Sequence, residues 1–472
     1  MSDERIDSRV ARGAAVSIAR TVIAYAVGAT AAVVLAKSLS PAAVGAGAAL
    51  SALHVIIVQV CALGLAQAIV RARAPVDTIR AAFWALQAAY SVLATVIIGV
   101  VAAGLLSGVN AFLAVSLAAY LLVQAWRFPL WISANRDVAL GRLATVETLD
   151  VLVFQGGAAV LAVAGFGVSS YGYALIAAGL TAAVCSAWMA RFHPGTPHLR
   201  GLRAVARDAG RLSLATTLTL TRELAAVPVI AVALGATAAG LLSWASSLAA
   251  FLVVGSVAAS QSLFAGVAAA RASDDAPGAT FAVRLIALGV CGAAGMLAAA
   301  APALTSLLAT DAWASAQEPM VLMLVAAVAV SLCAPLLQVA YARGRAHRAA
   351  RWQLWAIVVA FAGGLPIAVV TKLEMFCCAI AAGSVIMLTL AWRDGRAHGT
   401  LAQGTFAVVI RCAAAAIVAA IVGRAALTGG AMAGTMSAAV TAAVVYVATA
   451  TALGARRRAV DDLRALAVLL RG

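Results

Sequence analysis

Charged residues are scarce in this sequence, and their scarcity excludes an ordinary soluble protein. Of its 472 residues, 11% are charged and 64% are hydrophobic, and the mean hydropathy is +1.04. A soluble domain carries about 25% charged residues, because its surface faces water. The composition therefore predicts a polytopic membrane protein.

Sequence signals of metal, redox and hydrolytic chemistry are also missing. The seven cysteines form no CxxC pair and lie in apolar stretches, so we interpret them as small hydrophobic residues. The chain has no phosphate-binding loop and no nucleophile elbow. We expect no metal, no cofactor and no enzymatic activity. We expect no nucleic-acid partner either, because the net charge of +16 comes from unevenly placed basic residues.

Apolar runs long enough to cross a bilayer recur along the whole chain. A lipid-exposed backbone must satisfy its own hydrogen bonds, which favours helices, and the alternation of a transmembrane barrel is absent. The fourteen candidate spans lie near 13–36, 42–70, 81–104, 109–126, 144–166, 169–190, 212–235, 238–267, 285–308, 319–341, 352–371, 375–392, 412–428 and 431–454. The sequence predicts an all-α protein with about 14 transmembrane helices.

The placement of basic residues predicts the topology. If both termini are cytoplasmic, 28 of the 33 lysines and arginines, Arg127 among them, fall in cytoplasmic tails and connections. One missed helix would invert every later loop and destroy this bias. We therefore predict an even number of spans with both ends inside, in a multi-pass protein of the cytoplasmic (inner) membrane. Arg20 and Arg222 remain within spans.

Weak internal repetition divides the chain. Residues 40–53 align with 235–248, and residues 132–147 resemble 339–353, each at an offset of six helices. Both halves then start inside, as parallel repeats. The predicted parts are an N-terminal six-helix half (1–190), a basic cytoplasmic linker (191–211), a C-terminal six-helix half (212–395), two additional helices (396–454) and a basic cytoplasmic tail (455–472).

The linker between the halves carries arginines at helical spacing. Arg200, Arg203, Arg207 and Arg211 follow one another three or four residues apart. Such a stripe predicts an interfacial helix that contacts anionic lipids of the inner leaflet. An ordinary positive-inside loop that happens to be helical is the alternative.

Several stretches resemble the multidrug/oligosaccharidyl-lipid/polysaccharide (MOP) exporter superfamily, and within it the polysaccharide flippases of the O-antigen type (Wzx-like). The resemblance covers residues 12 to 395 and rests on small residues and turns. The stretches are ARTVIAYAVGATAAVVLAKSLSPAAVGAGAAL (19–50), GLAQAIVR (64–71), ATAAGLLSWASSL (236–248) and LLQVAYARGRAHRAARWQ (336–353).

This resemblance implies two six-helix halves followed by two further helices. It also implies transport by alternating access of a glycan linked to undecaprenyl pyrophosphate, from the inner to the outer leaflet, for cell-surface polysaccharide export. A polysaccharide polymerase or glycosyltransferases would be its partners. In many relatives the seventh helix carries an aspartate where this chain has Arg222 and Glu223.

Arg222 and Glu223 interrupt the apolar run 212–235 near its centre. Ten residues of helix place Arg222 about 15 Å deep, close to the bilayer midplane. Charge at that depth is costly and indicates a functional cavity. We interpret Arg222 as a glycan or phosphate contact and Glu223 as a substrate contact or ion-coupling carboxylate, with a structural ion pair as the alternative. Pro228, further along this helix, is a candidate hinge.

Arg20 lies in the first span on a stripe of small residues. A guanidinium binds phosphate oxygens through paired hydrogen bonds, so Arg20 is a candidate contact for a pyrophosphate. Snorkelling to the inner interface is the alternative. The remaining candidates are His54, Gln59 and Gln261 for hydrogen bonds to sugar, and Glu147 and Asp150 for ion coupling.

Two other functions stay open at this point. A cation-coupled drug or metabolite antiporter of the same superfamily would need several cavity carboxylates, whereas deep cations are at least as prominent here. A membrane-embedded glycan polymerase would need a sizeable outer loop. The predicted outer connections offer only Asp311, Glu318 and Glu374 as carboxylates.

Overall fold

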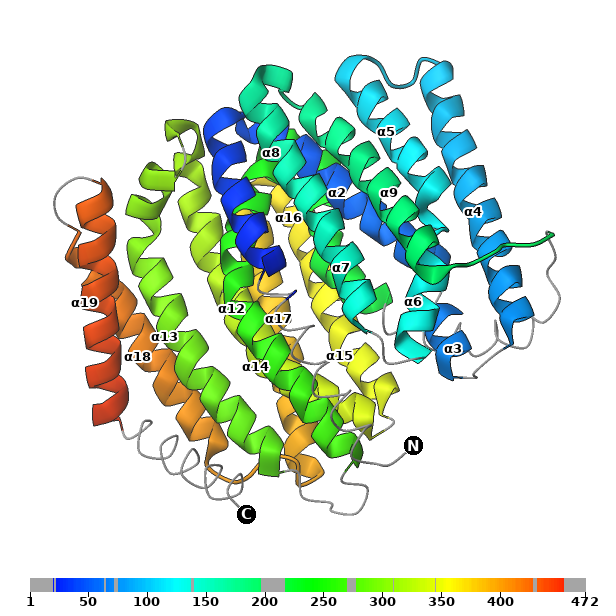
Figure 1. The fold of residues 1–472 in the computed structure, drawn as a ribbon. Helices are drawn as coiled ribbons and strands as arrows, with labels where there is room; N and C mark the ends of the chain where they lie inside the picture. The colour runs from blue at the N-terminus through cyan, green and yellow to red at the C-terminus, as the bar shows by residue number, and fades with distance from the viewer. Residues whose placement is uncertain are drawn as a thin grey trace. The chain divides into compact units, whose positions relative to one another are not determined.

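The structure, a computed structural model, is helical throughout the part of the chain that it describes (Figure 1). The described residues are 20, 23–62, 65–71, 75–136, 140–196, 217–269, 277–308, 310–343, 345–427 and 431–453. Both chain ends, most of the predicted linker 191–211 and the tail 455–472 lie outside these residues. Their cytoplasmic location stays a prediction.

The predicted class, an all-α protein with many membrane spans, is confirmed. Eleven described helices are long and apolar enough to cross a membrane, and a twelfth is counted if the bent pair α5 (Gly108–Gln124) and α6 (Arg127–Arg136) forms one span. Two more predicted spans coincide with shorter helices, Ile23–Ser38 and α11 (Ala226–Ala233). The count of fourteen stays a prediction.

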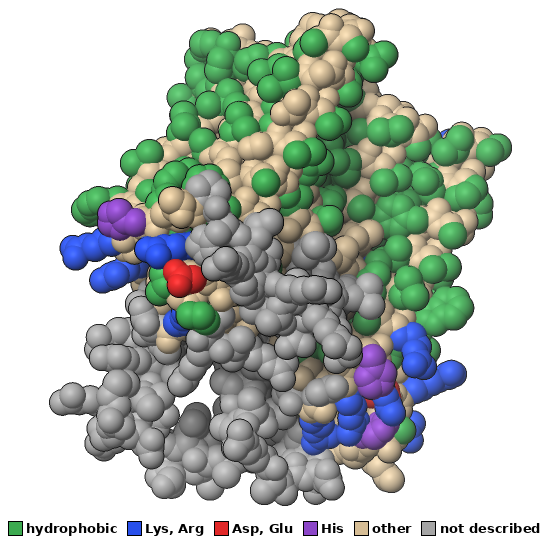
Figure 2. All heavy atoms as spheres, turned by 90° about the vertical axis from the view of Figure 1, so that its right-hand side faces the viewer, with side chains coloured by type: hydrophobic (Ala, Val, Ile, Leu, Met, Phe, Trp, Pro, Cys, Tyr) green, Lys and Arg blue, Asp and Glu red, His purple; other side chains and the backbone are tan. Residues whose placement is uncertain are grey.

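Exposed apolar side chains support a lipid environment. The exposed fraction reaches 76% for Trp188 and 90% for Val232. Water would penalise such exposure at many positions, whereas acyl chains do not. Figure 2 shows one face with a broad area of hydrophobic side chains and groups of lysine and arginine below it.

Contacts divide the chain into two compact units, Met1–Gly240 and Leu241–Gly472. In the N-terminal unit, α5 packs against α4 and α9, and α9 also packs against α6 and α7. Besides α5, α6, α11 and Ile23–Ser38, its helices are α2 (Pro41–Ala62), α3 (Leu65–Arg71), α4 (Val76–Ala102), α7 (Leu140–Val151), η1 (Leu152–Gly156), α8 (Gly157–Leu161), η2 (Ala162–Phe166) and α9 (Ser169–Ala190).

The C-terminal unit is built around α13, which packs against α14, α18 and α19 (Figure 1). Its helices are α12 (Ala236–Ala269, which starts in the other unit), α13 (Pro277–Leu308), η3 (Asp311–Ala316), α14 (Gln317–Ala342), α15 (Ala346–Ile357), η4 (Val358–Gly364), α16 (Leu365–Val370), α17 (Leu373–Ala397), α18 (Thr405–Ala425) and α19 (Ala431–Ala452). The division into six, six and two helices stays a prediction.

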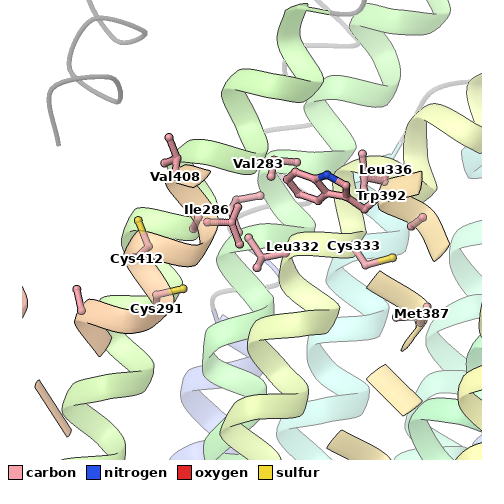
Figure 3. Packing of buried hydrophobic residues seen from close by; sticks show 14 of the residues in the cluster. Val283, Ile286, Cys291, Leu332, Cys333, Leu336, Met387, Trp392, Val408 and Cys412 are labelled. Atoms are coloured by element: carbon pink, nitrogen blue, oxygen red, sulfur yellow. The ribbon is translucent and has the colours of Figure 1, made fainter. Parts of the chain in front are cut away.

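The core of the C-terminal unit joins six of these helices, α13, α14, α15, α17, α18 and α19. Figure 3 shows part of this cluster. Ile286 of α13, Leu332 of α14, Met387 of α17 and Val408 of α18 are all buried in one apolar cluster. Cys412 lies in the same cluster, where a thiol serves as a small apolar group. Close packing of small side chains holds the helices together in the absence of a hydrophobic drive within lipid.

A local departure from α-helical geometry occurs at equivalent places in the two repeats. The segments 132–147 and 339–353 differ in length by one residue, and matching their last residues pairs Glu147 with Gln353 and Leu152 with Val358. The structure starts a π-helical segment at each of these two positions, η1 and η4. Single π turns are rare and frequently occur at functional sites. The internal repetition stays a prediction.

The other aligned pair of segments meets at two glycines. A Cβ on Gly45 would lie 1.8 Å from the Ala236 carbonyl oxygen, and one on Gly240 would lie 1.9 Å from the Pro41 carbonyl oxygen. The alignment pairs Gly45 with Gly240 and Pro41 with Ala236, so the contact is reciprocal. Only glycine permits this approach of α2 to the first turn of α12.

We therefore expect Gly45→Ala to destabilise the protein by about 1–3 kcal/mol, because the added methyl group overpacks the helix crossing. Thermal unfolding of the detergent-purified protein measures the effect. Gly99→Ala is the matched control, since a Cβ at Gly99 of α4 meets nothing within 4 Å. Equal melting temperatures for the two variants would show that α2 and α12 do not approach this closely.

Candidate functional site

Besides the pair of Asp77 and Arg80 in the first turn of α4, three ion pairs lie on predominantly apolar helices of the N-terminal unit. They join Arg20 to Glu147, Arg127 to Asp150 and Arg222 to Glu223. Three cations thus balance three carboxylates. Pairing lowers the free-energy cost of holding each charge away from water. A lone charge in lipid has no partner to lower that cost.

The first pair links the start of the first helix to α7. Arg20 donates from Nη1 to Glu147 Oε2, and the two side chains are 34% and 26% exposed. Further along the same helix, a Cβ on Gly28 would lie 3.1 Å from Gln155 Oε1 of η1. The small-residue face of the first helix therefore lies along α7 and η1.

The second pair is centred on Arg127, at the 46° bend between α5 and α6. Arg127 Nη1 donates to Asp150 Oδ2 at 2.8 Å and to the Tyr120 hydroxyl at 3.2 Å. Pro129, in the first turn of α6, cannot donate to the carbonyl of Ala125, which favours a bend at this point. Asp150 lies two residues before the π turn η1.

Aromatic contacts extend this network to α2. The His54 ring meets Tyr120 edge-on with centroids 5.0 Å apart, and Phe154 of η1 with centroids 5.9 Å apart. Tyr120 thereby connects His54 to Arg127. We call Arg20, Glu147, Arg127, Asp150, Tyr120 and His54 the N-terminal polar cluster.

The third pair adjoins the first helix. Arg222 Nη2 donates to Glu223 Oε1 at 2.6 Å, and its side chain is 10% exposed against 50% for the glutamate. Tyr25 of the first helix lies within electrostatic range of both Arg20 and Glu223. The first helix thus adjoins both the Arg20–Glu147 pair and the Arg222–Glu223 pair.

The helix that carries Arg222 is interrupted at Ala225, before α11 begins. Pro228 lies in the first turn of α11 and lacks the N–H that the Leu224 carbonyl would accept, which explains the interruption. The role of Pro228 as a hinge stays a prediction.

The remaining predicted residues have different outcomes. Gln59 is exposed on α2, and the side chain of Gln261 on α12 lies outside the described part. Glu147 and Asp150 each have an arginine partner, so a coupling cation would have to compete with a guanidinium. The assigned roles of all of these residues stay predictions.

Arg127 and Tyr120 are members of the cluster that the sequence analysis missed. Arg127 was counted as a cytoplasmic loop residue because the predicted span 109–126 ends just before it. The signal was the apolar run FPLWI at 128–132, which continues the helix beyond the bend. An arginine between two apolar runs needs a buried acceptor.

The C-terminal repeat provides an internal comparison. Glu147 and Asp150 align with Gln353 and Ala356, which are buried in α15, and Gln353 donates to the Tyr341 hydroxyl at 3.0 Å. A π turn follows in both repeats. The backbone geometry thus forms without charges at these positions, so the carboxylates of the N-terminal unit serve something other than this geometry.

A sequence profile of the family described as "Polysaccharide biosynthesis protein" matches residues 34–318 of this chain. The chain is similar in structure to the lipid II flippase MurJ in an inward closed conformation, with a TM-score of 0.72, 10% identity and coverage of 92% of this chain and 97% of that one. No curated protein sequence matches the chain.

Two MATE transporters have a less similar fold. An inward-facing MATE family transporter of the MOP superfamily has a TM-score of 0.58 and 16% identity, and covers 81% of this chain and 97% of its own. The Vibrio cholerae MATE transporter VcmN has a TM-score of 0.54 and 15% identity, and covers 84% and 98%. The resemblance to the MOP superfamily is confirmed. At sequence identities this low, the similar structures show the fold alone.

Asp150→Asn should destabilise the protein by about 1.5–3 kcal/mol, the value of a hydrogen bond to a charged group, because Arg127 loses its carboxylate. Thermal unfolding of the two single variants and of the double variant Arg127→Gln/Asp150→Asn measures the coupling. The loss of stability in the double variant should differ from the sum of the losses in the two single variants. Asp77→Asn is the control, since Asp77 is 73% exposed in its pair with Arg80 and should contribute at most about 1 kcal/mol. Additive losses would refute the coupling of Arg127 to Asp150.

Proposed function

Because the chain belongs to the polysaccharide biosynthesis protein family, we propose that it moves a lipid-linked oligosaccharide across the cytoplasmic membrane for cell-surface polysaccharide export. The carrier in this proposal is a polyprenyl pyrophosphate, and transport follows alternating access of two six-helix halves. The match of the fold to a lipid II flippase and to MATE transporters supports a transporter rather than an enzyme.

The observation that carries the proposal is the set of three arginines on apolar helices of the N-terminal unit. A pyrophosphate offers several oxygens that guanidinium groups bind through paired, charge-assisted hydrogen bonds. The C-terminal repeat builds the equivalent π turn with a neutral glutamine and an alanine. A purely structural role would not require this difference between the repeats.

The ion pairs suggest how the site works in the absence of substrate. Each carboxylate neutralises an arginine while the site is empty. An arriving pyrophosphate competes with Glu147 for Arg20, and with Glu223 for Arg222, because it presents more negative charge in a similar geometry. A displaced carboxylate then becomes a proton or cation acceptor, which is the ion-coupling role proposed for Glu147, Asp150 and Glu223.

The glycan and the protein partners complete the proposal. His54, Gln59 and Gln261 would donate or accept hydrogen bonds to sugar hydroxyls. A polymerase or glycosyltransferases would consume or supply the substrate, and Pro228 would absorb the bending of its helix. The basic linker 191–211 would lie on anionic lipids of the inner leaflet.

A drug or metabolite antiporter fits the described residues less well. Binding of an organic cation needs carboxylates that are not already neutralised. Glu147, Asp150 and Glu223 each have an arginine partner. A glycan polymerase is disfavoured as well, because α13 and α14 are joined on the predicted outer side by little more than η3, a helix of six residues.

Native mass spectrometry of the protein gently extracted from its own membranes tests the proposal. We expect the wild type to retain a polyprenyl-pyrophosphate glycan and Arg20→Gln and Arg222→Gln to retain about tenfold less or lower, since each loses a charge-assisted contact. Arg393→Gln, exposed on α17, is the matched control and should retain the wild-type amount.

Export of the glycan, measured in cells that depend on this chain, gives an independent readout. Both variants should lose export while their expression stays near the wild type. Unimpaired export together with unchanged lipid retention in both variants would refute the assigned role of the arginines.

A further inference from the structure

We propose that the C-terminal unit binds the phosphate group of an anionic phospholipid, in a pocket between α14, α15, α17 and the segment that follows α17. This site is independent of the proposed transport function. Its ligand would be a structural or regulatory lipid of the inner leaflet and not the transported glycan.

The pocket is a partly open hollow with two chemically distinct parts. Leu336, Val339 and Trp352 form an apolar wall. Arg343 and Arg345, at the junction of α14 and α15, supply the cations of the polar part. An apolar wall beside arginines is the pattern that a phospholipid meets where acyl chains give way to the headgroup.

Arg345 supplies a positive charge to the pocket. The lining also holds Arg343 and one carboxylate, Asp394. Arg348, just outside the lining, donates to Asp394 and contacts the His398 ring nitrogen at 3.0 Å. Asp394 is thereby neutralised, and no carboxylate among the described residues forms an ion pair with Arg345. The single positive charge of Arg345 suits a monoanionic phosphodiester.

Neighbouring hydrogen bonds hold the pocket wall in place. Arg343 Nη1 donates to Thr400 Oγ1 at 3.2 Å, and the Ala402 N–H donates to Thr280 Oγ1 of α13 at 3.0 Å. Leu401, between them, packs against Gly395 of α17. The segment that follows α17 is therefore fixed before any ligand arrives, which reduces the entropy lost on binding.

The start of α15 adds a second favourable contribution. Arg345 is its N-cap residue and makes no side-chain cap hydrogen bond. The first N–H groups of this 12-residue helix thus receive no cap from that side chain, at the end where the helix dipole is positive. An anion bound beside Arg345 would accept hydrogen bonds from these N–H groups and would be stabilised by the helix dipole.

The location favours a lipid over a soluble anion. α14 and α17 are both membrane spans by length and composition, and the pocket lies at their ends. The distribution of basic residues assigns these ends to the cytoplasmic side. Anionic lipids concentrate in that leaflet, where each nearby basic residue attracts them.

The test uses the full-length protein reconstituted in vesicles of equal parts phosphatidylglycerol and phosphatidylcholine, then extracted for native mass spectrometry. The wild type should retain phosphatidylglycerol in preference to phosphatidylcholine. Arg343→Gln/Arg345→Gln should lose about tenfold in this preference, as expected for lost charge-assisted contacts. Arg345→Gln alone should show a smaller loss, and it removes no hydrogen bond of the pocket wall.

The matched control is Arg393→Gln/Arg396→Gln, which removes two exposed charges from α17 outside the pocket. It should retain the wild-type preference. Equal losses in the two double variants would overturn the proposal, because they would indicate attraction by diffuse surface charge. Displacement of phosphatidylglycerol by millimolar inorganic phosphate would overturn it as well, because the pocket would then bind a soluble anion.

Discussion

The free-energy cost of placing charge on apolar helices governs the arrangement of the N-terminal unit. A guanidinium away from water needs an anionic partner or a hydrogen-bond acceptor. Arg20 finds Glu147 on α7, and Arg127 finds Asp150 three residues further along the same helix. α7 therefore joins the first helix to the α5–α6 bend, and the site and the packing of the unit depend on the same contacts.

Comparison of the two predicted repeats distinguishes residues that the fold needs from residues that the candidate site needs. Both repeats develop a π turn at equivalent positions, η1 and η4, yet the residues before the turn are Glu147 and Asp150 in one repeat and Gln353 and Ala356 in the other. Small residues, turns and helix irregularities thus account for a shared backbone. Only the N-terminal repeat has carboxylates at these two positions. The proposed binding of a pyrophosphate explains this difference between the repeats.

Much of this architecture could be predicted from the sequence, because hydrophobic length and basic loops report directly on membrane spans. Arg20 and Asp150 were singled out because charge within an apolar run is conspicuous. Their partners could not be predicted, since Arg20 and Glu147 are 127 residues apart and only helix packing brings them together. Arg127 was missed because a hydropathy boundary falls at the bend, where the chain changes direction without becoming polar.

An experimental structure of the protein with its co-purified lipid tests the central claim most directly. The account predicts the diphosphate within about 3 Å of the guanidinium of Arg20, Arg127 or Arg222, with at least one of the carboxylate partners displaced. A diphosphate bound elsewhere, with the ion pairs of Arg20, Arg127 and Arg222 intact, would contradict it.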